Sequence, residues 1–257
     1  MATTQLPSNA ADDGPASVVD LTSVMVKVRS RLDCSERSGP WKDVTTQRLR
    51  AAAPWRTFRW FKGQKHYSGT YWAATCASHV TYESRLELGR LLLADFDKSV
   101  SWVVSQPFLL EAVVEGQVRR HVPDYLLFTD DGPVVVDVKP AAQILKSVVA
   151  RTFAWTQEAV HSRGWSYEVW TGDASVYLSN IRFLAGFRRL QYFREEAIER
   201  MSLPHLIGMT VREAISQEQH LSADTARAAL MHVLWRQQLV VDLLRPLSGA
   251  RVLESAV

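Results

Sequence analysis

The alternation of apolar and polar residues in the middle of the chain predicts a series of helices and strands. Residues 82–95 carry leucines at helical spacing with polar residues between them, which indicates an amphipathic helix. Residues 145–163 predict a second helix, which stops at Gly164, a residue suited to the position after a helix end. Strands are expected in the β-rich stretches 100–111, 118–128, 134–138 and 165–170.

Two local signals qualify these strands. Pro123 interrupts the stretch 118–128 and indicates an edge strand or a local distortion, because proline cannot donate a backbone hydrogen bond to a neighbouring strand. Residues 130–133, Asp-Asp-Gly-Pro, predict a turn. The resulting order of helix, three strands, helix and strand predicts an α/β (α+β) core with a mixed sheet.

The pattern changes after about residue 195. Thr210 and Glu213 have the spacing of a capping box, which predicts a helix over 210–217. A second helix and the two short strands of a wing are expected next, at 222–238, 239–244 and 250–254. Helix, turn, helix and wing together predict a small winged-helix-like domain over 196–257.

Composition limits the class of protein. The 257 residues are 47% apolar and 22% charged, which is typical of globular domains, and residues 1–18 have the composition of a disordered tail. No apolar run approaches the roughly 18 residues of a membrane span, and the N-terminus does not have the pattern of a secretory signal. With two cysteines, which are too few for a disulfide framework, we expect a cytoplasmic protein with reduced thiols.

Charge is unevenly distributed along the chain. Residues 41–75 have a net charge of +6, whereas residues 195–257 have a net charge of −2. Within the basic part, aromatic residues alternate with four basic ones, Arg56, Arg59, Lys62 and Lys65. This segment either contacts DNA phosphates or forms a packed hairpin with a solvated basic face.

Two acids and a lysine are the main candidates for chemistry. Asp137 and Lys139 end the apolar strand two residues apart, so their side chains leave the same face of the strand. If Asp124 lies on the neighbouring strand, a hairpin brings it beside Asp137, and two adjacent carboxylates stay ionised readily only with a cation between them. Mg²⁺ suits such oxygen ligands. The alternative is a simple Asp–Lys ion pair at a strand end.

The wider pattern resembles a known family of nucleases. Pro123-Asp124 followed by Asp137-Val138-Lys139, after a helix that bears Glu83 and Glu87, resembles the PD-(D/E)xK nuclease superfamily. Within it, residues 58–189 are similar to the TnsA-like endonucleases of heteromeric cut-and-paste transposons. The segments that carry this resemblance are 63–69, 82–88, 94–97, 105–108, 119–125, 136–140 and 180–184.

The resemblance implies a fold, a chemistry and a set of roles. It implies a restriction-endonuclease-like αβββαβ core over 19–190 that hydrolyses DNA with Mg²⁺, for which Mn²⁺ substitutes. Asp124 and Asp137 would bind the metal, with the Val138 carbonyl as a further ligand and Glu87 completing the shell, directly or through water. Lys139 would orient or deprotonate the attacking water. Asp137 stands where the best-known family member has glutamine, so metal coordination here can differ in detail.

Several other residues are weaker candidates. Glu83 lies one turn before Glu87 on the same helix face, and Gln157 on the helix after Lys139 could lend a polar side chain to the site. The basic residues just before the Pro-Asp pair, Arg119 and Arg120, are candidates for phosphate contacts. His121 is a weaker candidate for a metal ligand or general base, because the family's chemistry uses metal-bound water.

The resemblance also implies partners. A TnsA-like subunit cuts the 5′ ends of the transposon in double-stranded DNA, a DDE-type transposase cuts and joins the 3′ ends, and an AAA+ ATPase regulates the pair. Because the C-terminal part is acidic, we expect it to bind a partner protein and not DNA. The alternative is that this part has only a structural role, as a cap on the nuclease domain. Two other functions stay open: a restriction or repair nuclease that works alone, and a catalytically silent DNA-binding or scaffold subunit.

Overall fold

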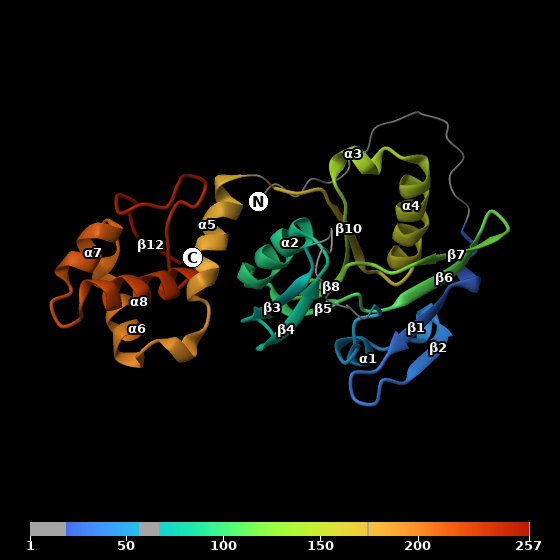
Figure 1. The fold of residues 1–257 in the computed structure, drawn as a ribbon, viewed down its shortest axis with the longest axis horizontal. Coiled ribbons are helices and arrows are strands. Elements are labelled where there is room, and N and C mark those ends of the chain that lie inside the picture. The colour runs from blue at the N-terminus through green and yellow to red at the C-terminus, as the bar shows by residue number, and fades with distance from the viewer. Residues whose placement is uncertain (1–18, 57–66, 174, 257) are drawn as a thin grey trace.

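A computed structural model describes residues 19–56, 67–173 and 175–256 (Figure 1). The tail expected at residues 1–18 lies outside the described residues. The molecule is elongated, with the hairpin of β6 (Leu109–Val114) and β7 (Gln117–His121) at one end and the C-terminal helices at the other (Figure 1). The combination of helices with several sheets confirms the α+β class predicted from the sequence.

A four-stranded mixed sheet forms the centre of the molecule, in the order β10-β9-β8-β5. Its strands are β5 (Val100–Ser105), β8 (Tyr125–Thr129), β9 (Gly132–Val138) and β10 (Ser166–Trp170). β8 pairs antiparallel with both β5 and β9, whereas β10 runs parallel to β9. The connection from β9 to β10 contains α3 (Ala141–Ile144) and α4 (Ser147–His161), because parallel neighbours need a long crossover.

Helices α2 (Arg85–Phe96) and α4 lie on opposite faces of this sheet (Figure 1). Leu127 and Val136 belong to the same buried cluster as the leucines of α2, whereas Leu126 and Val135 are buried with α4. Successive strand residues therefore supply two cores, which is why β8 and β9 are apolar at nearly every position.

A glycine sets how closely α2 approaches the sheet. A Cβ atom on Gly89 would lie 2.9 Å from the ring of Trp170 in β10. The helix accepts glycine in its interior, at a cost of roughly 0.5–1 kcal/mol relative to alanine, because no larger residue fits beneath it.

The two long strands predicted at 100–111 and 118–128 are wrong as single elements. Each is broken, and its second half belongs to a different sheet, because Gln106 has φ +45° and Pro123 cannot donate a hydrogen bond. The outer halves are β6 (Leu109–Val114) and β7 (Gln117–His121). They join β1 (Met25–Arg29) and β2 (Glu36–Pro40) in an antiparallel sheet of order β2-β1-β6-β7, which the sequence analysis did not anticipate.

The two breaks lie beside each other. The amide of Gln106 donates a hydrogen bond of 2.8 Å to the carbonyl of Asp124. The chain therefore leaves the central sheet after β5 and re-enters it before β8 at a common crossing point. Asp124, the first candidate acid, stands at this point.

A short helix and a hairpin complete the part before α2. They are α1 (Thr46–Arg50), β3 (Gly69–Ala73) and β4 (Ser78–Tyr82). The buried carboxylate of Asp95 on α2 accepts hydrogen bonds from the hydroxyl of Tyr71 and from the amides of Ala74 and Thr75. These bonds attach the hairpin to the C-terminal end of α2.

The C-terminal part consists of helices and a two-stranded sheet. Its elements are α5 (Val176–Leu184), α6 (Glu195–Met201), α7 (Val211–Gln217), α8 (Ala223–Trp235), β11 (Leu239–Val240) and β12 (Glu254–Ser255). The capping box of Thr210 and Glu213 is confirmed, and Ser222 caps α8. The strands β11 and β12 pair antiparallel but are shorter than predicted.

The C-terminal helices share a core with the rest of the protein. One buried apolar cluster extends from β9 and α2 through α5 to α8, and Phe96 contacts Trp235 with ring centroids 5.3 Å apart. The C-terminal part therefore packs directly on α2. None of the helices in the described parts of the chain combines the length and the apolar character that crossing a membrane requires.

Candidate functional site

Asp124 is held at the crossing point by both of its neighbouring strands. Its carbonyl accepts the bond from Gln106, and its amide donates to the carbonyl of Val136 over 3.1 Å. Its side-chain Oδ2 accepts a hydrogen bond of 2.7 Å from the amide of Val138. The carboxylate is therefore attached to the end of β9, next to Asp137.

Negative charge collects around Asp124. Burial, followed by the negative charges of Asp137 and Glu87, raises the pKa of Asp124 from 3.8 to about 8. The Val138 amide and the Lys139 ammonium oppose this rise only in part. Near neutral pH the protein therefore retains a proton on Asp124, and a cation at this point would take the place of that proton.

Asp137 is almost completely buried, at 2% exposed, and is bound by two side chains. Nε2 of His121 lies 2.8 Å and 2.9 Å from its two carboxylate oxygens. The hydroxyl of Tyr167 donates to Oδ2 over 2.5 Å. A buried carboxylate needs such donors, because an unpaired charge in the interior is costly.

Lys139 directly follows Val138, the last residue of β9, which is an inner strand of the central sheet. Its amide donates a hydrogen bond of 2.9 Å to the carbonyl of Trp170, and its side chain is half-buried. The predicted alternative was an ion pair between Asp137 and Lys139. Among the described residues Asp137 pairs with His121 instead, and the ammonium of Lys139 has no carboxylate within ion-pair distance.

Glu87 is oriented by the N-terminus of α2. Its two carboxylate oxygens accept hydrogen bonds from the amide of Glu83 over 2.7 Å and from the hydroxyl of Ser84 over 2.9 Å. The side chain of Ser84 in turn accepts from the amide of Glu87, as in a capping box. Burial raises the pKa of Glu87, and these hydrogen bonds counteract the rise. Glu83, the weaker candidate, forms an ion pair with Arg56 at 2.9 Å.

The arrangement fits a divalent cation at two of the three acids. Asp124 and Asp137 offer hard oxygen ligands beside one another, and burial together with the neighbouring acids raises the pKa of Asp124. Glu87 influences Asp124 electrostatically, and its oxygens also accept hydrogen bonds from Glu83 and Ser84 at the start of α2. Across the ranges that the structure describes, no three His, Cys, Asp or Glu side chains form a ready metal-binding group. The role of Glu87 in the metal shell stays a prediction.

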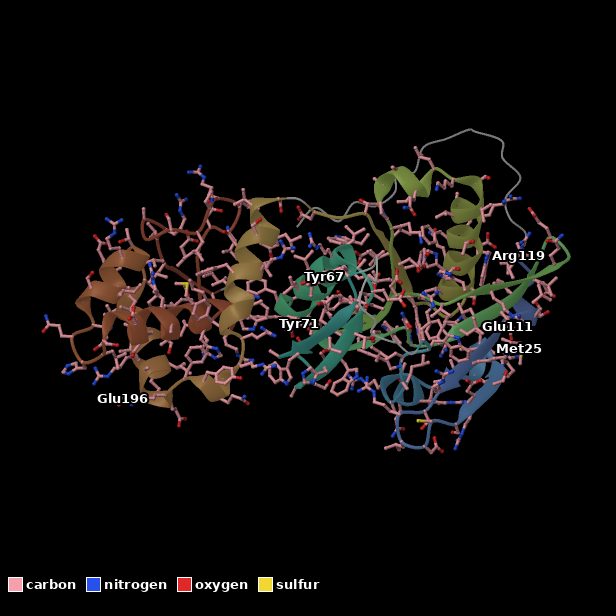
Figure 2. All side chains as sticks on the ribbon, in the orientation of Figure 1. Met25, Tyr67, Tyr71, Glu111, Arg119 and Glu196 are labelled. Atoms are coloured by element: carbon pink, nitrogen blue, oxygen red, sulfur yellow. The ribbon has the colours of Figure 1, made fainter. Side chains whose placement is uncertain are left out.

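The predicted DNA-contacting residues are in different situations. Arg119 is exposed on the β6–β7 hairpin (Figure 2). Arg120 forms an ion pair with Glu111 on the same hairpin. Arg56 is engaged with Glu83. The remaining predicted contacts lie outside the described residues: Arg59, Lys62 and Lys65.

The structure brings two further residues to the site. The sequence marks His121 only as a weaker candidate for a metal ligand or base, and no local pattern marks Tyr167. Their common role at Asp137 depends on bringing β7 and β10 together, which residue spacing does not reveal. Gln157 is half-buried on α4, with no hydrogen bond to the candidate acids among the described residues, and the hydroxyl of its neighbour Thr156 bonds to the carbonyl of Thr152.

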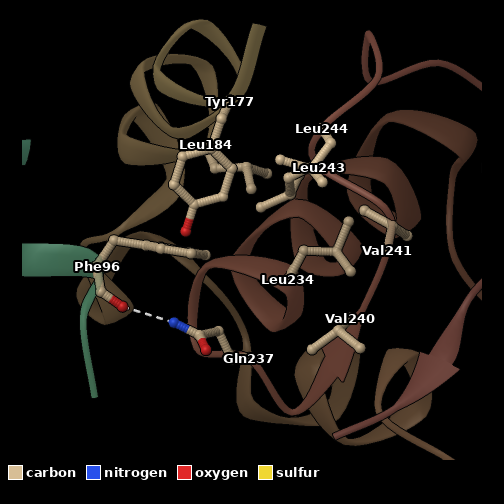
Figure 3. Close-up of a pocket in the computed structure, with 9 residues that line it drawn as sticks. All are labelled: Phe96, Tyr177, Leu184, Leu234, Gln237, Val240, Val241, Leu243 and Leu244. Carbon is tan, nitrogen blue, oxygen red and sulfur yellow. Dashed lines mark hydrogen bonds between the residues drawn. The ribbon is translucent and has the colours of Figure 1, made fainter. Parts of the chain in front are cut away.

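A separate apolar cavity of about 190 Å³ lies between α5, α8 and the end of α2 (Figure 3). Phe96, Tyr177 and Leu244 are among its lining residues, and Gln237 closes one side by donating a hydrogen bond to the carbonyl of Phe96. None of the predicted site residues lines it, so it belongs to the junction between α2 and the C-terminal helices.

Comparison with protein-family models finds no match for this chain, and comparison with curated proteins finds none either.

Proposed function

We propose that this protein is a metal-dependent DNA endonuclease that acts as a TnsA-like subunit of a heteromeric transposase. It would cut the 5′ ends of a transposon during cut-and-paste transposition. The single observation that carries the proposal is the Asp124–Asp137 pair beside Lys139, with the pKa of Asp124 raised to about 8. The motif resemblance supplies the family, and the mixed sheet between α2 and α4 agrees with the restriction-endonuclease-like core proposed for residues 19–190.

The proposed chemistry is hydrolysis of a phosphodiester. Mg²⁺ held by Asp124 and Asp137 would lower the pKa of its bound water and stabilise charge on the phosphate. Lys139 would donate a hydrogen bond to the attacking water or to a phosphate oxygen, since its ammonium has no carboxylate partner among the described residues. Water oxygen bonds to phosphorus, the bond from phosphorus to the 3′ oxygen breaks, and the products carry a 5′-phosphate and a 3′-hydroxyl.

For the C-terminal part we propose a winged-helix-like domain that docks a protein, either the DDE-type transposase or the AAA+ regulator. In a winged helix that reads DNA, the second helix of the helix-turn-helix lies in the major groove. Here every residue of α8 from Ala229 to Trp235 is buried against the rest of the protein. The exposed first turn carries Asp224, which repels phosphate.

A calorimetric titration tests the metal site. Mn²⁺ is titrated into the full chain and into Asp124→Ala and Asp137→Ala, with Asp130→Ala in the exposed β8–β9 turn as the matched control. We expect binding to be lost in the first two variants and retained in the control. Equal binding in all four proteins would place the metal elsewhere and contradict the mechanism. Cleavage is then assayed with the partner transposase on transposon-end DNA. Robust cleavage without a partner would favour a nuclease that works alone.

A catalytically silent DNA-binding or scaffold subunit is the second candidate function. The observation in its favour is that, across the ranges that the structure describes, no three His, Cys, Asp or Glu side chains form a ready metal-binding group. It predicts that Asp124→Ala leaves transposition unchanged in cells that carry the whole system. A loss of transposition in that variant, with normal protein levels, rules out the silent subunit.

A further inference from the structure

The carboxylate of Asp137 forms hydrogen bonds with two side chains from elements that are far apart in the sequence. His121 is the last residue of β7, in the antiparallel β2-β1-β6-β7 sheet. Tyr167 lies on β10, the edge strand of the central sheet. Both direct their polar atoms at this one carboxylate, over 2.5 Å to 2.9 Å. Asp137 therefore joins the two sheets through its side chain, at the same end of β9 as Asp124.

Aromatic rings hold both donors in place. The imidazole of His121 contacts Phe153 and Trp155 of α4, with ring centroids 6.2 Å and 6.3 Å apart. Phe153 also contacts Tyr167, at 6.5 Å. The side chains of Phe153 and Trp155 are buried, so neither donor can turn away from Asp137 without displacing the core under α4.

His121 and Tyr167 do not occupy all the acceptor positions of the Asp137 carboxylate. An ionised carboxylate offers about four acceptor positions on its two oxygens, and two donors leave positions for a cation. Charge-assisted hydrogen bonds of this kind also fix the plane of the carboxylate. Without such donors, the carboxylate of an aspartate at the end of a strand is free to rotate. Asp124 is fixed differently, by the single backbone amide of Val138.

We propose that His121 and Tyr167 are positioning residues, which hold Asp137 in the orientation that binds the divalent cation. This inference rests on the proposed function, because it concerns the same metal site. It accounts for a histidine and a tyrosine converging on one buried acid at the edge of the candidate site. Partners of this kind around metal ligands typically contribute about 10–100-fold to metal affinity.

The test uses metal affinity, which a merely structural role would leave unchanged. Mn²⁺ is titrated calorimetrically into the EDTA-treated full chain and into Tyr167→Phe, His121→Leu and His121→Gln. Tyr177→Phe serves as the matched control, since Tyr177 is a half-buried tyrosine that lines the separate cavity. Tyr167→Phe keeps the ring and removes only the hydroxyl, so the packing against Phe153 is preserved.

We expect the dissociation constant for Mn²⁺ to rise about 10–100-fold in Tyr167→Phe and His121→Leu. In His121→Gln the affinity should recover, because the glutamine amide can donate to Asp137 from nearly the same place. The control should bind as the unaltered chain does. Thermal unfolding in EDTA, measured on each variant, establishes that the protein is folded.

Three outcomes contradict the inference. Unchanged affinity in both loss variants would make His121 and Tyr167 purely structural. Tighter binding in Tyr167→Phe would mean that the donors compete with the metal for Asp137. Both results leave the proposed function intact. If the unaltered chain binds no Mn²⁺, alone or with a DNA duplex, the proposed function fails, and this inference fails with it.

Discussion

The backbone amide of Val138 donates a hydrogen bond of 2.7 Å to Oδ2 of Asp124, which ties the acid before β8 to the end of β9. One hydrogen bond does not offset burial and two nearby negative charges, so the pKa of Asp124 stays raised, at about 8.

Asp124 should make the metal-free protein less stable as the pH rises. Its pKa is higher in the folded than in the unfolded chain, so the folded state binds the proton more tightly. The stabilisation is complete below about pH 4 and is lost as the pH rises toward about 8. In EDTA, we expect the melting temperature to fall more over this range for the unaltered chain than for Asp124→Asn. Parallel curves for the two proteins would show that Asp124 does not carry this proton.

Metal binding should release a proton. A cation beside Asp124 favours its ionised form, so near neutral pH the acid gives up a proton when Mn²⁺ binds. Calorimetry in two buffers with different ionisation enthalpies should therefore give different apparent binding enthalpies. Identical enthalpies in both buffers would mean that Asp124 is already ionised before the metal arrives.

A pair of variants separates the two roles open to Glu87. Ser84→Ala removes the N-cap of α2 and should lower the free energy of unfolding by about 1 kcal/mol without changing Mn²⁺ affinity. Glu87→Gln should weaken Mn²⁺ binding if the acid completes the metal shell. Chemical denaturation and calorimetry on both variants give the two quantities. Full Mn²⁺ affinity in Glu87→Gln would leave Glu87 as a cap alone.

Trp235 should be central to the stability of the whole chain. It is 4% exposed and packs on Phe96, so Trp235→Ala opens the core between α2 and α8. We expect a loss of about 3–5 kcal/mol in the free energy of unfolding, measured by urea denaturation. Leu244→Ala, at a residue 77% exposed, is the control and should change it by less than about 0.5 kcal/mol. A small effect of Trp235→Ala would mean that the C-terminal part folds independently.

Arg119 and Arg227 should differ in their effect on DNA binding. Both arginines are exposed, the first on β7, two residues before His121, and the second on α8. Arg119→Ala should weaken binding of a DNA duplex and reduce its salt dependence, because one phosphate contact is lost. Arg227→Ala should bind as the unaltered chain does. Fluorescence anisotropy at several salt concentrations measures both, and a larger effect at Arg227 would show that α8 does contact DNA.

The helices α2, α4, α7 and α8 were predicted from the sequence because their signals are local, whereas α1, α5 and α6 were not predicted. Leucine spacing indicated α2, and the capping box of Thr210 and Glu213 indicated α7, since both depend on residues within a few positions of one another. The long strands were not resolved, because the break at Gln106 depends on a left-handed backbone in a residue that rarely adopts it. The strands β1 and β2 were missed because β1 pairs with β6, far along the chain, and β2 is largely exposed and pairs only with β1 among the described strands.

The residues of the candidate site also divide into those that local sequence signals mark and those that only the tertiary fold brings together. Asp124, Asp137 and Lys139 could be named because a proline, a short strand and a two-residue spacing mark them locally. His121 and Tyr167 are 46 residues apart along the chain, and their convergence on Asp137 is a product of the tertiary fold. The cap formed by Glu87 and Ser84 was within reach of the sequence, since the two residues have capping-box spacing.

The side chain of Asn180 attaches the loop at residues 243–247 to α5. Its amide nitrogen donates to the carbonyls of Leu243 and Arg245, and its oxygen accepts from the amide of Leu247. Deamidation would replace the donating nitrogen with an acceptor oxygen that faces the same two carbonyls, and the loop would be pushed off α5. The helical backbone around Asn180 and the bulk of Ile181 hinder the ring closure that deamidation requires. Folding should therefore slow deamidation of Asn180 and preserve its hydrogen bonds to the loop.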